Sequence, residues 1–278
     1  MNTESRAAEP RSELDLAAYL KRVGLASIPP ATTAGLAVLH LAHATHIPFE
    51  NIDVLLGKPI RLDLASLQEK LVRDRRGGYC FEQNVLFAAI LEEMGFQVTR
   101  LAARVRYRAS RLLPRTHMLL AIDTHDGRWI ADVGFGGSGL LVPVRLVANA
   151  EQRQFHWTYR LVEEGPAWVL QHRQPSGWED FYAFTMEPQE IVDYEVANYY
   201  VSTHPGSPFT HTLAAQLPTP EARHILRNRE LTTERAGQTE SRIVRDDELL
   251  DLLATLFGLI VPPGTTFPDR PWGWKPGE

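Results

Sequence analysis

Several features that decide where a protein works are scarce or absent in this sequence. Cys80 is the only cysteine among 278 residues, so an intrachain disulfide is excluded and a reducing cytoplasm is expected. The longest apolar run, 256–263, is too short to cross a bilayer, and the polar first twelve residues lack the apolar core of a signal peptide. These absences predict a cytoplasmic protein without a membrane partner.

Charge of one sign is not in excess either. The formal net charge is -5 and no block of like charge is present, so the composition gives no general attraction to nucleic acid. Hydrophobic residues make up 44% of the chain, as in ordinary globular proteins, and the length allows two or three subdomains. The open question is whether Cys80 is an inert core residue or a reactive thiol.

The periodicity of apolar residues changes near residue 95. Up to that point it predicts helices at about 14–23, 34–47, 67–72 and 80–95. Beyond it, turn residues separate short β segments at 98–107, 116–122, 128–133, 156–163, 167–173 and 181–186, and a further helix is expected at about 247–256. The pattern predicts an α+β protein, in which a helical bundle precedes an antiparallel sheet or small barrel and a mixed tail.

Cys80 stands at the predicted start of the fourth helix, in the segment Arg-Arg-Gly-Gly-Tyr-Cys-Phe-Glu-Gln-Asn. A helix N-terminus favours anions, and a thiol there is readily converted to the nucleophilic thiolate. Gly77 and Gly78 allow a sharp turn and close approach of another group. The alternative is a small buried hydrophobe, since free cysteines are often buried. Glu82 and Arg76 are expected to form a structural ion pair nearby.

His117 and Asp132 are the candidates to activate this thiol. A thiolate nucleophile needs a histidine to take and return protons, and the histidine needs an orienting acceptor. A four-residue loop at 123–126 would place His117 directly opposite Asp132 on one face of a hairpin. The alternative is a purely structural His–Asp pair. Together with Cys80, the two residues predict a Cys/His/Asp triad.

Two other patterns do not predict cofactor sites. His40, His43 and His46 are spaced by three residues on one predicted helix, but the outer two diverge around it, so no metal is expected. The glycines at 134–139 fit a dinucleotide fingerprint, yet the following segment, with Pro143, cannot begin the long helix that such a site requires. We interpret these glycines as a tight turn that permits ligand approach.

Five segments, taken together, resemble one family, the arylamine N-acetyltransferases of bacterial type. They are Ile-Pro-Phe-Glu-Asn (47–51), Arg-Gly-Gly-Tyr-Cys-Phe-Glu-Gln-Asn (76–84), Thr-His-Met (116–118), Asp-Val-Gly-Phe-Gly-Gly (132–137) and Asn-Tyr-Tyr-Val-Ser-Thr-His-Pro (198–205). They occur in the family's order, and the similarity extends over roughly 14–210. The resemblance implies a helical bundle at 1–95, a β-barrel at 96–200 and an α/β lid at 201–278, with a core like that of cysteine proteases and transglutaminases.

The resemblance also implies a ping-pong reaction. Cys80 would accept acetyl from acetyl-coenzyme A and pass it to an arylamine or hydrazine, with His117 as base and acid and Asp132 as its orienting partner. Phe49 and Phe135 would line the acceptor pocket. The positions expected near coenzyme A are Val105, Ser202, Thr203 and Phe209. No metal is implied, and either a monomer or a homodimer is expected.

Other functions remain open at this point. The same triad would serve an amide synthase that releases a polyketide as a macrolactam, or a thiol hydrolase, and a catalytically silent binding protein is the third possibility. The choice among acetyl, propionyl and malonyl donors depends on one or two methylenes of space, which the residues do not reveal.

Overall fold

The N-terminal part of the chain is helical in the computed structural model, which describes residues 14–270. Its elements are α1 (Leu16–Arg22), α2 (Thr33–His46), strand β1 (Phe49–Glu50), α3 (Ile52–Leu55), α4 (Leu64–Leu67), the π-helical turn η1 (Gln68–Arg73) and α5 (Cys80–Glu93). The helix predicted at 67–72 is wrong in extent. Asp63 caps it by accepting a hydrogen bond from the Ser66 N–H, so the helical segment begins at residue 64.

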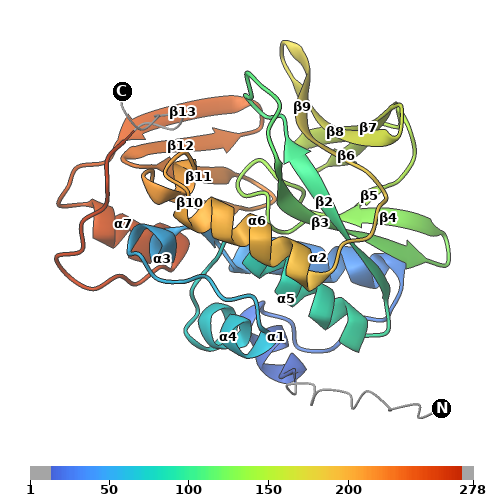
Figure 1. Ribbon diagram of the computed structural model, residues 1–278, viewed down its shortest axis with the longest axis horizontal. Helices are drawn as coiled ribbons and strands as arrows, with labels where there is room; N and C mark the ends of the chain where they lie inside the picture. The colour runs from blue at the N-terminus through green and yellow to red at the C-terminus, as the bar shows by residue number, and fades with distance from the viewer. Residues whose placement is uncertain (1–13, 271–278) are drawn as a thin grey trace, which may run out of the picture.

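Eight antiparallel strands form a nearly closed barrel beside these helices (Figure 1). In spatial order they are β5 (Val144–Arg145), β4 (Gly127–Ala131), β3 (Arg115–Thr124), β2 (Gln97–Val105), β9 (Gly177–Phe184), β8 (Ala167–Gln174), β7 (Trp157–Glu164) and β6 (Gln152–Gln154). The Gln152 side chain bonds both the N–H and the carbonyl of Arg145, and Gln154 does the same for Val142. These side-chain amides link the two ends of the sheet.

Strand β3 is buried on both faces, and its side chains alternate between two cores. Met118 and Leu120 pack into the core formed with the helices, whereas Leu119 and Ala121 pack into the barrel interior. Successive side chains of a strand point to opposite faces, so one strand can take part in both cores. β3 therefore holds α5, and with it Cys80, against the barrel.

The C-terminal part forms a second antiparallel sheet. Its elements are α6 (Ile191–Thr203), the short 3-10 helix η2 (Pro208–Thr210), β10 (Ala214–Pro218), β11 (Arg223–Arg227), β12 (Glu230–Arg235), β13 (Gln238–Ile243) and α7 (Leu249–Phe257). Strand β1 of the N-terminal part completes this sheet by pairing with β10, with Phe49 opposite Gln216. In Figure 1 this sheet lies to the left and the barrel to the upper right.

These elements confirm the predicted α+β class, with a helical bundle, an antiparallel barrel and a C-terminal α/β part. The strand predicted at 181–186 is wrong in position. Gly177, at φ 132°, already pairs with Gln174 across a two-residue turn, so β9 begins there and ends at Phe184. The division of the chain at residues 95 and 200 stays a prediction, and α6 spans the second of these boundaries.

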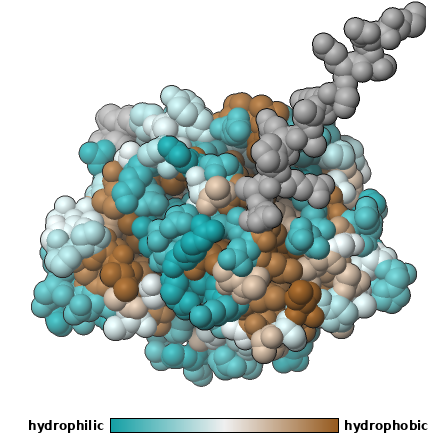
Figure 2. Space-filling view, turned by 90° about the horizontal axis from the view of Figure 1, so that it is seen from below, coloured by the Kyte–Doolittle hydropathy of each residue, from teal (hydrophilic) through white to brown (hydrophobic). Residues whose placement is uncertain are grey.

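The surface on the side seen from below in Figure 1 is mixed in character. Figure 2 shows hydrophobic and hydrophilic patches interspersed on this face. Between residues 14 and 270, no helix combines the length and the apolar character needed to cross a membrane.

Replacing Leu120 with alanine tests the contribution of the core between β3 and the helices. Leu120 is fully buried, whereas Leu112 is 82% exposed. Leu120→Ala removes buried methyl groups and leaves a cavity, so it should lower the free energy of unfolding by about 2–5 kcal/mol. Leu112→Ala should change it by no more than about 0.5 kcal/mol. Urea denaturation measures both, and equal effects would contradict the assignment of Leu120 to the core.

Candidate active site

Cys80 is the first residue of α5, as predicted. It is 6% exposed, and its thiol donates a weak hydrogen bond to the carbonyl of Thr116, with Sγ and O 3.7 Å apart. The N–H groups of the first helical turn have no partner within the helix, so they and the helix dipole favour negative charge at this end. The sulfur therefore lies next to the strand segment that carries His117.

His117 and Asp132 form a close pair, with 2.7 Å between Nε2 and Oδ2. The predicted loop at 123–126 is wrong, because Thr124 pairs with Gly127 and leaves a turn of only two residues. Continuing this register puts Asp132 two residues away from direct opposition to His117. A shift of two residues keeps side chains on the same face, so the pair meets as diagonal neighbours.

The carboxylate of Asp132 is buried among hydrogen-bond donors. Besides His117, it accepts bonds from Asn84 Nδ2 at 3.0 Å and from the Gly134 N–H at 2.9 Å, both on Oδ1. Burial opposes ionisation of this carboxyl, but His117 and these donors hold its pKa below the ordinary value. Asp132 is therefore a fixed anion whose second oxygen is directed at the histidine.

The electrostatics of the pair favour a protonated histidine. Burial alone would lower the pKa of His117, but Asp132 and then Cys80 outweigh it and raise that pKa to about 10. Because Nε2 faces Asp132, Nδ1 is the ring nitrogen left for the thiol. An imidazolium is thus held between a carboxylate and the sulfur throughout the neutral pH range.

The glycine segment after Asp132 passes close to Cys80. A Cβ atom on Gly134 would lie 2.7 Å from Cys80 Cα and 2.6 Å from Asn84 Nδ2, so the close packing requires glycine. The backbone from 134 to 143 forms no helix, in agreement with the rejection of a dinucleotide site. At Gly134 the group that comes close is part of the protein itself, the start of α5. The predicted approach of a ligand to this segment stays a prediction.

Both predicted acceptor-pocket aromatics lie by this segment. The Phe135 ring is 5.3 Å from that of His117, centroid to centroid, and stacks on Phe181 at 4.9 Å. Phe49 is nearly buried, and a Cβ atom on Gly136 would lie 3.4 Å from its ring. The structure therefore brings Phe135 to His117 and Phe49 to the glycine segment, while their contact with an acceptor stays a prediction.

The four residues predicted to lie near coenzyme A are on three different elements, β2, α6 and η2. Val105 ends β2, and Ser202 and Thr203 lie in the last turn of α6, where both hydroxyls donate to carbonyl oxygens one turn earlier. The Phe209 ring, on η2, lies 5.9 Å from that of Tyr79, the residue before Cys80. Ser202 also acts on the Tyr79 side chain through a hydrogen bond, so Phe209 and Ser202 are both linked to the residue before Cys80, and the four assignments stay predictions.

The predicted ion pair between Arg76 and Glu82 is wrong. Arg76 bonds Glu50 at 2.7 Å, and Glu82 bonds Lys70 at 2.7 Å. The reason is the pairing of β1 beside the loop that precedes α5, through the bridge between residues 49 and 78. This pairing brings Glu50 to Arg76, and nothing in the local sequence signals it.

Two residues that contact His117 or Asp132 were not predicted from the sequence to do so. The Asn84 side chain donates to the Met118 carbonyl and also to the carboxylate of Asp132. The sequence contains an indication of this position, because Asn84 follows Cys80 by four residues and therefore lies on the same face of the helix. Tyr182 packs its ring 4.9 Å from that of His117, and burial followed by the nearby charge of Asp132 raises its pKa.

His40 also supports Asp132. Its Nδ1 donates to the Leu141 carbonyl at 3.0 Å, so Nε2 accepts the Asp132 N–H at 3.1 Å. Burial lowers the pKa of His40 to about 4, which keeps the ring neutral. Across the described residues 14–270, no three His, Cys, Asp or Glu side chains are grouped to hold a metal.

Comparison with known proteins extends over most of the chain. A family model described as N-acetyltransferase matches residues 32–265. An arylamine N-acetyltransferase of Mycolicibacterium smegmatis is 42% identical over 253 residues, covering 88% of this chain and 92% of that protein. The structure of the Nocardia farcinica arylamine N-acetyltransferase matches with a TM-score of 0.86 at 44% identity, covering 91% of this chain and 92% of that one. The Mycobacterium marinum arylamine N-acetyltransferase in complex with CoA gives 0.84 at 37% identity, covering 88% and 92%.

The helical bundle, barrel and α/β part bring a cysteine, a histidine and an aspartate together, and the proteins that match this chain are acyltransferases. The chain belongs to the arylamine N-acetyltransferase family. The resemblance drawn from the five sequence segments is thereby confirmed.

Alkylation of Cys80 tests the charge of the histidine. Because the pKa of His117 is raised to about 10, its positive charge is complete at neutral pH and is lost as the pH rises through that value. A cation beside a thiol favours the thiolate, so iodoacetamide should modify Cys80 rapidly at about pH 6.5, well below the pKa of about 8.5 of a free thiol. His117→Gln should remove this advantage at the same pH. An alkylation rate that follows an ordinary thiol titration in the unaltered protein would contradict the expectation.

Proposed function

We propose that this protein transfers acetyl from acetyl-coenzyme A to arylamines or hydrazines by a ping-pong mechanism with an acetyl-Cys80 intermediate. One observation carries the proposal: the buried pair of His117 and Asp132 meets the thiol at the N-terminus of α5. This arrangement supplies a nucleophile, its base and the group that orients the base. The donor is supported by the Mycobacterium marinum relative, whose structure was solved with CoA.

In the first half-reaction the thioester is exchanged. His117 holds the proton of the Cys80 thiol, the sulfur forms a bond with the acetyl carbon, and the carbon–sulfur bond to coenzyme A breaks. The departing coenzyme A sulfur takes the proton from His117 and leaves as a thiol. The N–H groups at the start of α5 favour the oxyanion formed on the way.

In the second half-reaction the acetyl group moves to nitrogen. The amine lone pair attacks the acetyl carbon, His117 takes the proton that the amine loses, and the bond from that carbon to Cys80 breaks. The sulfur leaves as a thiolate beside the imidazolium, which restores the starting pair. Asp132 stabilises the imidazolium and keeps Nε2 occupied, so Nδ1 stays directed at the reacting groups.

The surroundings of the triad fit an aromatic acceptor. Phe135 packs edge-on against His117, and Phe49 lies across the same glycine segment, so an arylamine ring would meet apolar rings beside the histidine. Val105, Ser202, Thr203 and Phe209 are proposed to contact coenzyme A. Both substrates are small molecules, and the cytoplasmic location and the monomer or homodimer remain predictions.

Intact mass after brief exposure to acetyl-coenzyme A, without acceptor, tests the mechanism. The protein should gain about 42 Da, because a covalent intermediate accumulates when the second substrate is missing. Addition of an arylamine or hydrazine should discharge the adduct. Cys80→Ser is the control and should gain nothing, because the hydroxyl is a far weaker nucleophile at neutral pH.

The other outcomes separate the alternative chemistries. Release of coenzyme A without an adduct would indicate hydrolysis and contradict the proposed transfer. Neither adduct nor release from acetyl-coenzyme A, followed by an adduct from longer acyl thioesters, would favour the macrolactam-forming reaction instead.

A further inference from the structure

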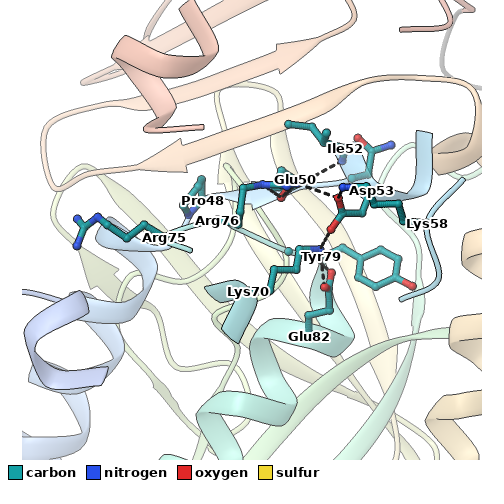
Figure 3. A network of polar contacts seen from close by, with 12 residues as sticks. Pro48, Glu50, Ile52, Asp53, Lys58, Lys70, Arg75, Arg76, Tyr79 and Glu82 are labelled. Carbon is teal, nitrogen blue, oxygen red and sulfur yellow. Dashed lines mark hydrogen bonds and ion pairs between the residues drawn. The ribbon is translucent and has the colours of Figure 1, made fainter. Parts of the chain in front are cut away.

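A network of charged side chains lies beside the first turn of α5 (Figure 3). Its members come from β1, α3, η1, the loop before α5 and α5 itself, and are Glu50, Asp53, Lys70, Arg76 and Glu82. Lys70 is central, since its Nζ lies 2.7 Å from Glu82 Oε1 and 2.9 Å from Asp53 Oδ2. The proposed reaction uses none of these groups directly.

Glu82 connects this network to the nucleophile. Its other oxygen, Oε2, accepts a hydrogen bond of 3.0 Å from the N–H of Tyr79, the residue immediately before Cys80. The carboxylate therefore caps the end of the helix at which the thiol lies. The backbone position of Cys80 depends on where this carboxylate is held.

The space for the carboxylate is provided by a glycine. A Cβ atom on Gly78 would lie 2.7 Å from Oε2 and 2.8 Å from Cδ of Glu82. Any larger residue at this position would displace the carboxylate from the Tyr79 N–H. The loop before α5 is thus shaped to place Glu82 at the helix end.

The charge on Glu82 depends on Lys70. Glu82 is 2% exposed, and burial raises the pKa of its carboxyl while Lys70 provides the largest opposing effect. Burial also disfavours the Lys70 ammonium, but Glu82, Glu50 and Asp53 hold its pKa above the ordinary value. Removal of one partner from such a pair leaves an uncompensated buried charge.

We propose that Lys70 is a positioning residue for Cys80, whose ammonium keeps Glu82 ionised and directed at the Tyr79 N–H and balances its charge at the nucleophile's end of α5. Without Lys70, Glu82 has two states, and both harm the thiol. An ionised Glu82 adds an unbalanced negative charge near the thiolate, and a protonated Glu82 holds the Tyr79 N–H less strongly. This role presupposes the proposed function of Cys80 as nucleophile.

The other carboxylates of the network would keep a cationic partner if Lys70 were removed. Glu50 repels Glu82 but keeps Arg76 at 2.7 Å, and Asp53 keeps Arg76 at 3.3 Å. Across residues 14–270, Glu82 has no ion-pair partner besides Lys70. Tyr79 and Cys80 flank it from the start of α5. Glu82 is therefore the group whose pKa should rise further once Lys70 is removed, because burial raises it and Lys70 is the main opposing influence.

Lys70→Met tests this role. Acetylation of Cys80 by acetyl-coenzyme A at neutral pH should slow by about tenfold or more, as expected for loss of a buried charge-assisted bond. Iodoacetamide alkylation of Cys80 should gain a dependence on pH that the unaltered protein lacks, because loss of Lys70 raises the pKa of the buried Glu82 carboxyl further. Lys70→Gln, which also removes the charge, replaces Lys70→Met if the latter does not fold, with the same expectations.

Two further variants separate positioning from general stability. Lys58 also pairs with Asp53, at 3.4 Å, but its side chain is 59% exposed, so Lys58→Met should leave both rates and the pH profile unchanged. Lys70→Met combined with Glu82→Gln keeps an amide oxygen for the Tyr79 N–H without the buried charge. This double variant removes the unbalanced charge but leaves a neutral hydrogen bond to the Tyr79 N–H, so it should recover part of the lost rate and abolish the new pH dependence.

The outcomes distinguish the two proposals. A folded Lys70→Met with unaltered rates and pH profile, or a double variant slower than Lys70→Met alone, would overturn the role of Lys70. Failure of the unaltered protein to form acetyl-Cys80 would instead overturn the proposed function. In that case the alkylation profiles of the same variants still decide whether Lys70 controls the thiol.

Discussion

The buried hydrogen bond between His117 and Asp132 is the interaction on which the rest of the site depends. Two ionisable groups removed from water cost free energy unless both are paired and their remaining atoms are bonded. Asn84 on α5 and the Gly134 N–H after β4 meet this requirement for the Asp132 carboxylate, and His40 on α2 accepts the Asp132 backbone N–H. One carboxylate thus connects the helical part to the barrel, and the position of the thiol relative to the histidine follows from these bonds.

The sequence was sufficient for the features that depend on local periodicity. The start of α5 at Cys80 follows from the glycine turn before it and the apolar spacing after it. The meeting of His117 and Asp132 was predicted despite a wrong hairpin loop, because a register error of two residues leaves every side chain on its face. An error of one residue would have separated them. The meeting of the two side chains could therefore be predicted because it depends on which strand face they share and not on the exact register.

What could not be predicted are contacts between segments far apart along the chain. The two-residue strand β1 is recognisable only through its pairing with β10, and the partner of Arg76 depends on it. The strands of the C-terminal sheet were missed for a related reason. β13 is exposed along its whole length, so no alternation of apolar and polar residues marks it. Likewise, the link between the barrel ends depends on the amides of Gln152 and Gln154.

Two acid–cation pairs with buried carboxylates flank the first turn of α5, and together they determine the charge that the thiol meets. On the barrel side, the cation, His117, faces the sulfur and its acid, Asp132, lies behind it. On the bundle side the order is reversed, because the acid, Glu82, caps the helix end and Lys70 lies behind it. An uncompensated carboxylate there would oppose the imidazolium, so stabilisation of a thiolate by His117 requires Glu82 to be neutralised by Lys70 as proposed. The helix dipole and the histidine can then act on the sulfur in the same direction.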